Sequence, residues 1–213
     1  MGSSTALTDP AARLVADAST IINLIATGNA GAILSALPNR VLVVDVVPVE
    51  LETGRRRGRE AFDRLTELAN IGAVAIVGLS DEAALYFEDL AVGAAAATLD
   101  DGEAATIAYA LAHAGTALID ERKATRICAQ RFPTLQVACT VDVLVHPEVQ
   151  RRLGADLLGE AAFRALQDGR MGVLPRHVDW IVGLIGEARA ALCPSLPRRF
   201  RTSSATAKLP SGN

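Results

Sequence analysis

The chain has 213 residues, half of them hydrophobic and only 4% aromatic, with a formal net charge of −3 at pH 7. This length fits one domain with an appendage or two small domains, and the acidic balance argues against a protein that coats nucleic acid non-specifically. No uncharged apolar run reaches the roughly 18–20 residues that span a bilayer, and no signal peptide is visible. We therefore expect a cytoplasmic protein with no membrane association.

The charged residues and the cysteines are distributed in a way that limits the kind of metal site. Residues 1–146 hold 18 acidic and 11 basic residues, whereas residues 147–213 hold 6 acidic and 10 basic ones. Cys128, Cys139 and Cys193 are odd in number and lack a CxxC spacing, which argues against disulfides and a structural zinc site. Since there are only three histidines, we expect any metal to be a hard cation on oxygen ligands.

Short apolar runs alternate with helical patterns along the first two thirds of the chain. The predicted strands are residues 14–16, 40–45, 73–79, 116–120 and 135–139. They are continuously apolar rather than alternating, as expected for a parallel sheet covered by helices on both faces. The pattern predicts an α/β fold with three layers, α/β/α, and a mainly parallel central sheet.

After residue 146 the pattern contains helices only. Residues 148–167 and 175–192 are predicted helices, the second with an apolar stripe that includes Trp180 and Leu184. The final residues are basic and rich in Pro and Ser, a composition typical of disorder. The predicted organisation is a domain at 13–146, a helical C-terminal extension at 147–192 and a disordered tail at 193–213.

Four acids from separate segments are placed by this pattern near one edge of the sheet. Asp17 ends the first strand and Asp120 the fourth. Glu50 follows the second strand, and Glu103 lies in the first turn of the helix before the fourth strand. Each acid alone has an ordinary explanation as a helix cap, a first-turn residue or a solvated side chain. Gathered carboxylates repel one another unless a cation compensates, so together they indicate a site for one or two Mg²⁺ or Mn²⁺ ions.

The order of four segments resembles a PIN domain over residues 13–146. These segments read "LVADAST", "VVPVELETGR", "DDGEAATIAYALAHAGTALIDERKATRICAQRF" and "LQVACTVDVL". The "GEAATIA" and "LIDERKA" stretches are the specific part, and the best-matching groups include the VapC-like toxins of prokaryotic toxin–antitoxin systems. The resemblance implies a metal-dependent endoribonuclease that leaves a 5′-phosphate and a 3′-hydroxyl.

The same resemblance implies roles for individual residues. Asp17, Glu103 and Asp120 would hold Mg²⁺ or Mn²⁺, and Glu50 would bind a second ion or orient the attacking water. The supporting residues would be Ser19, Asp101, Glu121 and Thr140. Cys139 stands where relatives often have glycine, and Asp142 lies in a segment that is often apolar or small.

An arginine-rich run follows the segment that carries Glu50. "RRRGR" supplies the candidate contacts to the RNA backbone, Arg55, Arg56, Arg57 and Arg59. A solvated charge run is the alternative for these arginines. The partners implied by the resemblance are an RNA substrate, an antitoxin protein and a second copy of the chain in a homodimer.

Two other functions remain open. The first is a non-catalytic PIN-like binding module, whose acidic pocket would accept an Arg or Lys from a partner. The second is a phosphatase of the aspartyl-phosphate type, which also begins with an Asp after the first strand. That chemistry commonly uses a DxD arrangement, whereas this chain has "DAS" at residues 17–19.

Overall fold

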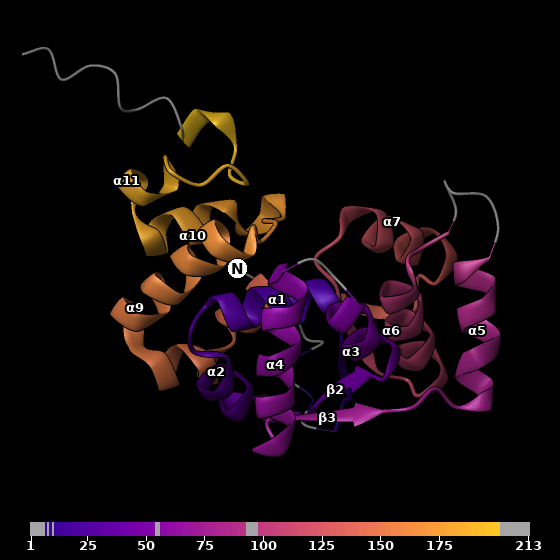
Figure 1. Cartoon of the computed structure of the whole chain (residues 1–213). Helices are drawn as coiled ribbons and strands as arrows, with labels where there is room; N and C mark the ends of the chain where they lie inside the picture. The colour runs from indigo at the N-terminus through magenta and orange to yellow at the C-terminus, as the bar shows by residue number, and fades with distance from the viewer. Residues whose placement is uncertain (1–6, 8, 10, 54–55, 93–97, 201–213) are drawn as a thin grey trace, which may run out of the picture.

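Five short strands form one parallel sheet at the centre of the molecule (Figure 1). The computed structural model describes residues 7, 9, 11–53, 56–92 and 98–200, and only the backbone of residues 56–59. The strands follow the order β3-β2-β1-β4-β5. They are β1 (Leu14–Ala16), β2 (Val41–Val44), β3 (Val74–Val77), β4 (Thr116–Leu118) and β5 (Gln136–Ala138). The predicted parallel α/β architecture is confirmed.

Helices cover both faces of this sheet, which explains why the strands are apolar on both sides. They are α1 (Ala18–Ala26), α2 (Ala30–Ala36), α3 (Val46–Thr53), α4 (Arg56–Asn70), α5 (Asp81–Ala91), α6 (Asp101–Ala112), α7 (Arg122–Arg131) and α8 (Thr140–Val145). Leu14 and Ala16 of β1 pack into one core with α1, α2 and α4. Val15, between them, packs into a second core with α5, α6 and α7. Successive strand residues point to opposite faces, so a strand buried on both sides needs an unbroken apolar run.

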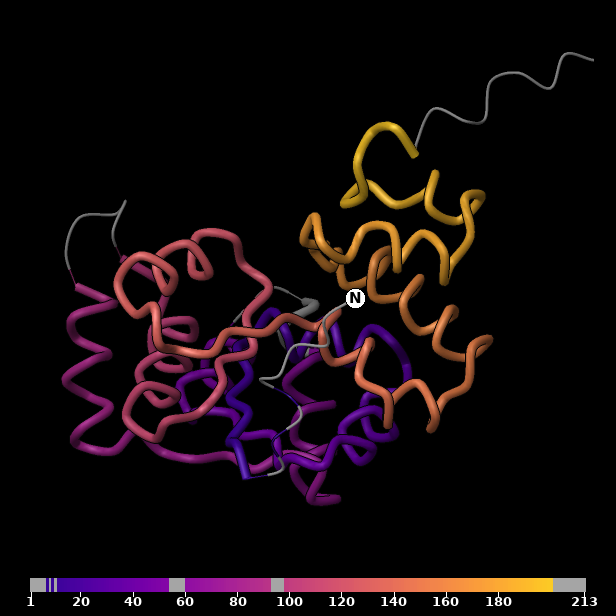
Figure 2. The backbone as a smooth tube through the Cα atoms, turned by 180° about the vertical axis from the view of Figure 1, so that it is seen from behind, coloured from indigo at the N-terminus to yellow at the C-terminus, as the bar shows by residue number. Residues whose placement is uncertain are grey.

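The C-terminal helices pack onto one side of the sheet domain and share its core. They are α9 (Pro147–Arg164), the π-helical turn η2 (Ala165–Gly169), the 3₁₀ turn η3 (Pro175–His177), α10 (Val178–Ile185), α11 (Glu187–Ala190) and the 3₁₀ turn η4 (Arg198–Phe200). Figures 1 and 2 show α9, α10 and α11 together on the side away from α5. Leu158 of α9 and Ile181 of α10 belong to the same buried cluster as Ile21 of α1. The predicted helical extension is therefore confirmed, and it is part of the main core.

Two details of the C-terminal part differ from the sequence prediction. The predicted helix 148–167 is kinked at Gly154, whose φ of +72° interrupts the helix. The predicted disordered tail begins too early, because Cys193 and Leu196 are buried in the main core and residues 198–200 form η4. The composition of this segment predicted disorder, but the side chains of Cys193 and Leu196 are buried in the core. Residues 201–213 lie outside the described residues.

No single helix among the described residues is both long and apolar enough to cross a bilayer. The pair α1 and α2 meets the length and composition requirement jointly, but the two helices are bent by 113°.

Candidate active site

The centre of the sheet places Asp17 and Asp120 side by side. β1 pairs with β4, with Ala16 opposite Leu118, although the two strands are about 100 residues apart. The chain runs from β1 outward to β3 and then returns to the other side of β1 with β4. Such a reversal leaves a crevice beyond the carboxyl ends of the strands, where ligands bind in open α/β sheets. Asp17 and Asp120 follow the two strands that border this crevice.

Asp17 is fixed by the start of α1. It is the N-cap residue of that helix, and its Oδ1 accepts a hydrogen bond from the Thr20 backbone N–H at 2.7 Å. Its Oδ2 accepts from the Ser19 hydroxyl at 2.8 Å. The Thr20 hydroxyl in turn donates to the Leu118 carbonyl at 3.0 Å, which ties the cap to β4. The predicted supporting residue Ser19 therefore contacts Asp17 directly.

Asp120 is held by side chains from two other elements. The Thr140 backbone N–H donates to Asp120 Oδ1 at 2.8 Å, and the Thr140 hydroxyl donates to Oδ2. The Asn23 amide also donates to Oδ2, at 2.6 Å. Sequence reasoning included Thr140 but missed Asn23. The signal was present, because Asn23 is a lone buried amide in the apolar run of α1, and a buried amide needs partners.

Glu103 lies in the first turn of α6, and Glu50, a residue of α3, packs against the same turn. Asp100 caps this helix by accepting the Glu103 N–H at 2.9 Å. The electrostatic neighbours of Glu103 are Asp100, Asp17 and Glu121. Those of Glu50 are Asp100 and Asp101. Asp120, Asp17 and Glu103 are thus successive electrostatic neighbours, and Asp100 links Glu103 to Glu50. The predicted supporting acids Glu121 and Asp101 adjoin Glu103 and Glu50, respectively.

Glu50 depends on the glycine in the first turn of α6. A Cβ added at Gly102 would lie only 2.1 Å from Glu50 Oε2. The carboxylate of Glu50 therefore lies directly against the helix backbone, where a larger residue than glycine would displace it. Glu50 Oε2 is buried and has no hydrogen-bond partner within the described part of the chain. A buried carboxylate oxygen without a partner is costly, so this atom is suited to a ligand.

Burial and mutual repulsion raise the pKa values of these acids. Burial raises the pKa of Asp17 to about 7, and the neighbouring Asp120 adds to this. Burial also raises the pKa of Glu103 to about 8, with further contributions from Asp100, Asp17 and Glu121. The pKa values of Asp120 and Glu50 are raised as well, mainly by burial. Carboxylates in this state gain strongly from a nearby cation, and an all-oxygen donor set fits Mg²⁺ or Mn²⁺.

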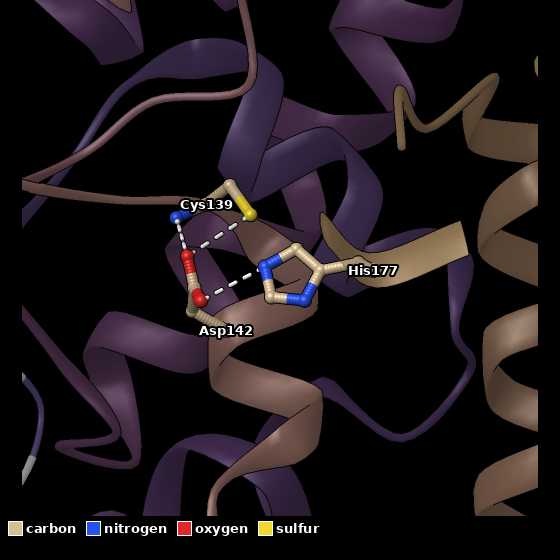
Figure 3. A group of neighbouring side chains, drawn as sticks. All are labelled: Cys139, Asp142 and His177. Atoms are coloured by element: carbon tan, nitrogen blue, oxygen red, sulfur yellow. Dashed lines mark hydrogen bonds and ion pairs between the residues drawn. The ribbon is translucent and has the colours of Figure 1, made fainter. Parts of the chain in front are cut away.

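A second buried cluster lies beside this site (Figure 3). Cys139, Asp142 and His177 bring a thiol, a carboxylate and an imidazole within 4.8 Å of one another, an arrangement that could hold a metal ion. Asp142 accepts the Cys139 backbone N–H at 2.9 Å and faces His177 Nε2 at 2.9 Å. Arg176 also binds Asp142, at 2.7 Å. We call these four residues the Asp142 cluster.

The Asp142 cluster is electrically compensated by its own residues. Burial alone would raise the pKa of Asp142, but hydrogen bonds from His177 and Cys139 hold it well below its usual range. The guanidinium of Arg176 on the same carboxylate would oppose a metal cation. We therefore interpret the cluster as a clamp that ties η3 to α8, whose first residue, Thr140, holds Asp120. Sequence reasoning missed it because His177 lies 35 positions after Asp142, with no local spacing to link them.

The side chains predicted to contact RNA lie outside the described residues. Arg55 lies outside the described residues, and the side chains of Arg56, Arg57 and Arg59 do as well, although their backbone belongs to α4. Their role in RNA binding stays a prediction.

A family model described as a PIN domain matches residues 13–186, which is most of the chain and includes α9 and α10. Neither the curated proteins nor the solved structures gave a match. The predicted domain boundary at residue 146 stays a prediction. The match and the acid-lined crevice at the centre of a parallel sheet lead to one conclusion: the chain belongs to the PIN domain family, whose members are generally nucleases.

Proposed function

We propose that this protein is a metal-dependent endoribonuclease that hydrolyses RNA phosphodiester bonds at the four-acid site. The observation that carries the proposal is the gathering of buried acids beyond the carboxyl ends of β1 and β4, together with a buried Glu50 oxygen that has no hydrogen-bond partner among the described residues. Asp17, Glu50, Glu103 and Asp120 all have raised pKa values, whereas the pKa of the compensated Asp142 is lowered. Such uncompensated carboxylates at a ligand-binding crevice are typical of a functional site.

The residues divide into ligands and the groups that orient them. Asp17, Glu103 and Asp120 would hold Mg²⁺ or Mn²⁺. The metal ion would act as a Lewis acid that lowers the pKa of water and neutralises phosphate charge. Ser19 and the Thr20 N–H fix the Asp17 carboxylate. Asn23 and Thr140 fix that of Asp120 in the same way. Glu50, set against Gly102, is placed to orient the attacking water or bind a second ion.

The finer identity follows from the resemblance to VapC-like toxins. In this proposal the protein is the toxin of a toxin–antitoxin pair, acts on RNA in the cytoplasm, is inhibited by an antitoxin protein and forms a homodimer. The family match supports the nuclease part of the proposal. The toxin role, the antitoxin and the homodimer rest on sequence resemblance alone.

The phosphatase alternative is disfavoured by the residue that stands two positions after Asp17. An aspartyl-phosphate enzyme of this kind commonly carries a second acid there, in a DxD arrangement. In this protein the residue is Ser19, which serves as a donor to Asp17 rather than as a second acid.

Cleavage of a structured RNA mixture by the purified protein tests the proposal. We expect cleavage with Mn²⁺ or Mg²⁺, none with EDTA, and a loss of at least 100-fold in Asp17→Asn and Glu103→Gln. Asp156→Asn, at an exposed acid of α9, is the matched control and should cleave like the wild type. Absence of both cleavage and metal binding in the wild type would overturn the nuclease proposal and favour the binding module.

A further inference from the structure

A cavity of about 300 Å³ lies beside the acid site, between the sheet domain and the C-terminal extension. One wall consists of Ser19, Asn23 and Asp120, and the facing wall consists of Gly169, Arg170 and Gly172. Arg122, the first residue of α7, also lines it. The cavity therefore joins residues that hold the proposed metal site to residues that come from far along the chain.

The extension lies close to the acid site at this point. A Cβ added at Gly169 would lie 2.6 Å from Asn23 Oδ1, so this backbone packs directly on the side chain that holds Asp120. A Cβ at Gly172 would lie 3.7 Å from the Asp120 carbonyl oxygen, an ordinary packing distance. Residues 169–172 are thus a wall of the site itself.

The two arginines of this cavity occupy positions that local structure disfavours. Arg122 lies in the first turn of α7, where the helix dipole disfavours a cation. Arg170 has φ +59° and ψ +34°, a left-handed conformation in which residues other than glycine are strained. Both are exposed, and neither guanidinium has a hydrogen bond or ion pair within the described ranges. Two residues at one cavity thus violate local structural preferences, and such violations are expected at functional sites.

We propose that Arg122 and Arg170 bind phosphates of the RNA strand, so that the C-terminal extension forms one wall of the substrate groove. The inference rests on the proposed function. A guanidinium binds phosphate through two parallel hydrogen bonds, which fixes orientation as well as charge. The neighbouring acids Asp120 and Glu121 repel an approaching polyanion, and two fixed cations at the same cavity offset that repulsion.

The groove continues on the other side of Arg122. A second cavity, of about 500 Å³, is also lined by Arg122, together with Val173, Pro175 and Arg199. It is also lined by Ser195, whose hydroxyl is buried and has no hydrogen-bond partner in the part of the chain described. Arg199 lies 3.5 Å from Asp179 in an exposed, weak ion pair. A strand that passes from the acid site along Arg122 therefore reaches a further cation, Arg199.

Binding of a labelled single-stranded RNA in EDTA, which prevents metal-dependent cleavage, tests the groove. The variants are Arg122→Ala and Arg170→Gly, the latter because glycine accepts the left-handed backbone and removes only the guanidinium. We expect each to weaken RNA binding about tenfold and to reduce the slope of log K against log salt by about 1. Arg152→Ala, at an exposed arginine of α9, is the control and should bind like the wild type.

The same variants in the cleavage assay separate the two proposals. If the wild type does not cleave but Arg122→Ala and Arg170→Gly weaken RNA binding, the groove stands and the nuclease proposal fails. If the wild type cleaves and both variants keep its KM, affinity and salt slope, the groove is wrong and the nuclease proposal stands. If the wild type neither binds nor cleaves RNA, both are overturned.

Discussion

The four-acid site and the Asp142 cluster lie next to each other, and the buried acids in them behave in opposite ways. Asp142 is buried against Arg176 and His177, and its pKa is lowered. Asp17 is at least as buried, yet its main charged neighbour is another acid, Asp120, and its pKa is raised to about 7. Burial alone therefore does not identify a functional carboxylate. The source of the compensating charge distinguishes the two sites: the chain supplies it for Asp142, whereas we propose that a metal ion supplies it for Asp17.

The largest difference should appear when each acid is neutralised. Asp142→Ala removes the partner of His177, Arg176 and the Cys139 N–H, so we expect it to lower the free energy of unfolding by about 3 kcal/mol. Asp17→Asn removes a repelled buried charge, so metal-free stability at pH 8 should stay equal or rise. Urea unfolding of both variants in EDTA measures this. Equal losses in both would remove the distinction between the two sites.

The pH dependence of stability should have opposite signs at the two sites. The folded pKa of Asp17, about 7, exceeds its ordinary value of 3.8, so the metal-free protein should lose stability as pH rises from about 4 to 7. We expect a loss on the order of 2 kcal/mol, which Mn²⁺ should restore and Asp17→Asn should reduce. The contribution of Asp142 is present above pH 3.8 and is lost as pH falls below it. Thermal unfolding in EDTA between pH 5 and 8 measures the summed effect of Asp17 and the neighbouring acids whose pKa values are also raised, such as Glu103. The difference between the wild type and Asp17→Asn gives the part due to Asp17, and wild-type stability that increases over that range would contradict the expectation.

The position of Glu50 should be sensitive to the glycine behind it. Gly102→Ala places a methyl group 2.1 Å from Glu50 Oε2, so the flexible carboxylate has to move away. We expect cleavage to fall about tenfold, because a group misplaced by an ångström orients poorly, while stability hardly changes. Gly183→Ala is the control, because a Cβ there meets nothing within 4 Å. Full activity in Gly102→Ala would show that Glu50 has no role.

The smallest effect is expected where the extension packs on Asn23. Gly169→Ala places a Cβ 2.6 Å from Asn23 Oδ1 and 3.1 Å from Ala26 Cβ, so the backbone of residue 169 has to shift. We expect a loss of about 1 kcal/mol in the free energy of unfolding and a weaker hold on Asp120. Gly172→Ala, with a Cβ at 3.7 Å, should be neutral. Denaturant unfolding distinguishes the two, and equal stability would mean that the extension is not tightly packed there.

The sequence predicts the parts of this protein that follow from short-range patterns. Unbroken apolar runs predicted the parallel sheet, and the acids at the ends of the first and fourth strands predicted a site at one edge, where β1 and β4 place Asp17 and Asp120 together. Contacts between distant segments gave no such signal. Neither the link between His177 and Asp142 nor the approach of Gly169 to Asn23 has a local pattern, since each depends on how the extension packs.

Calorimetric titration of Mn²⁺ into metal-free protein at neutral pH tests whether the four-acid site holds a metal ion. We expect binding to the wild type with release of protons, because the carboxyls with raised pKa values must ionise. We expect Asp17→Asn to abolish this binding and Asp142→Asn to retain it. If Asp17→Asn binds Mn²⁺ like the wild type while Asp142→Asn does not, the metal is held by the Asp142 cluster, and the account of the four-acid site is wrong.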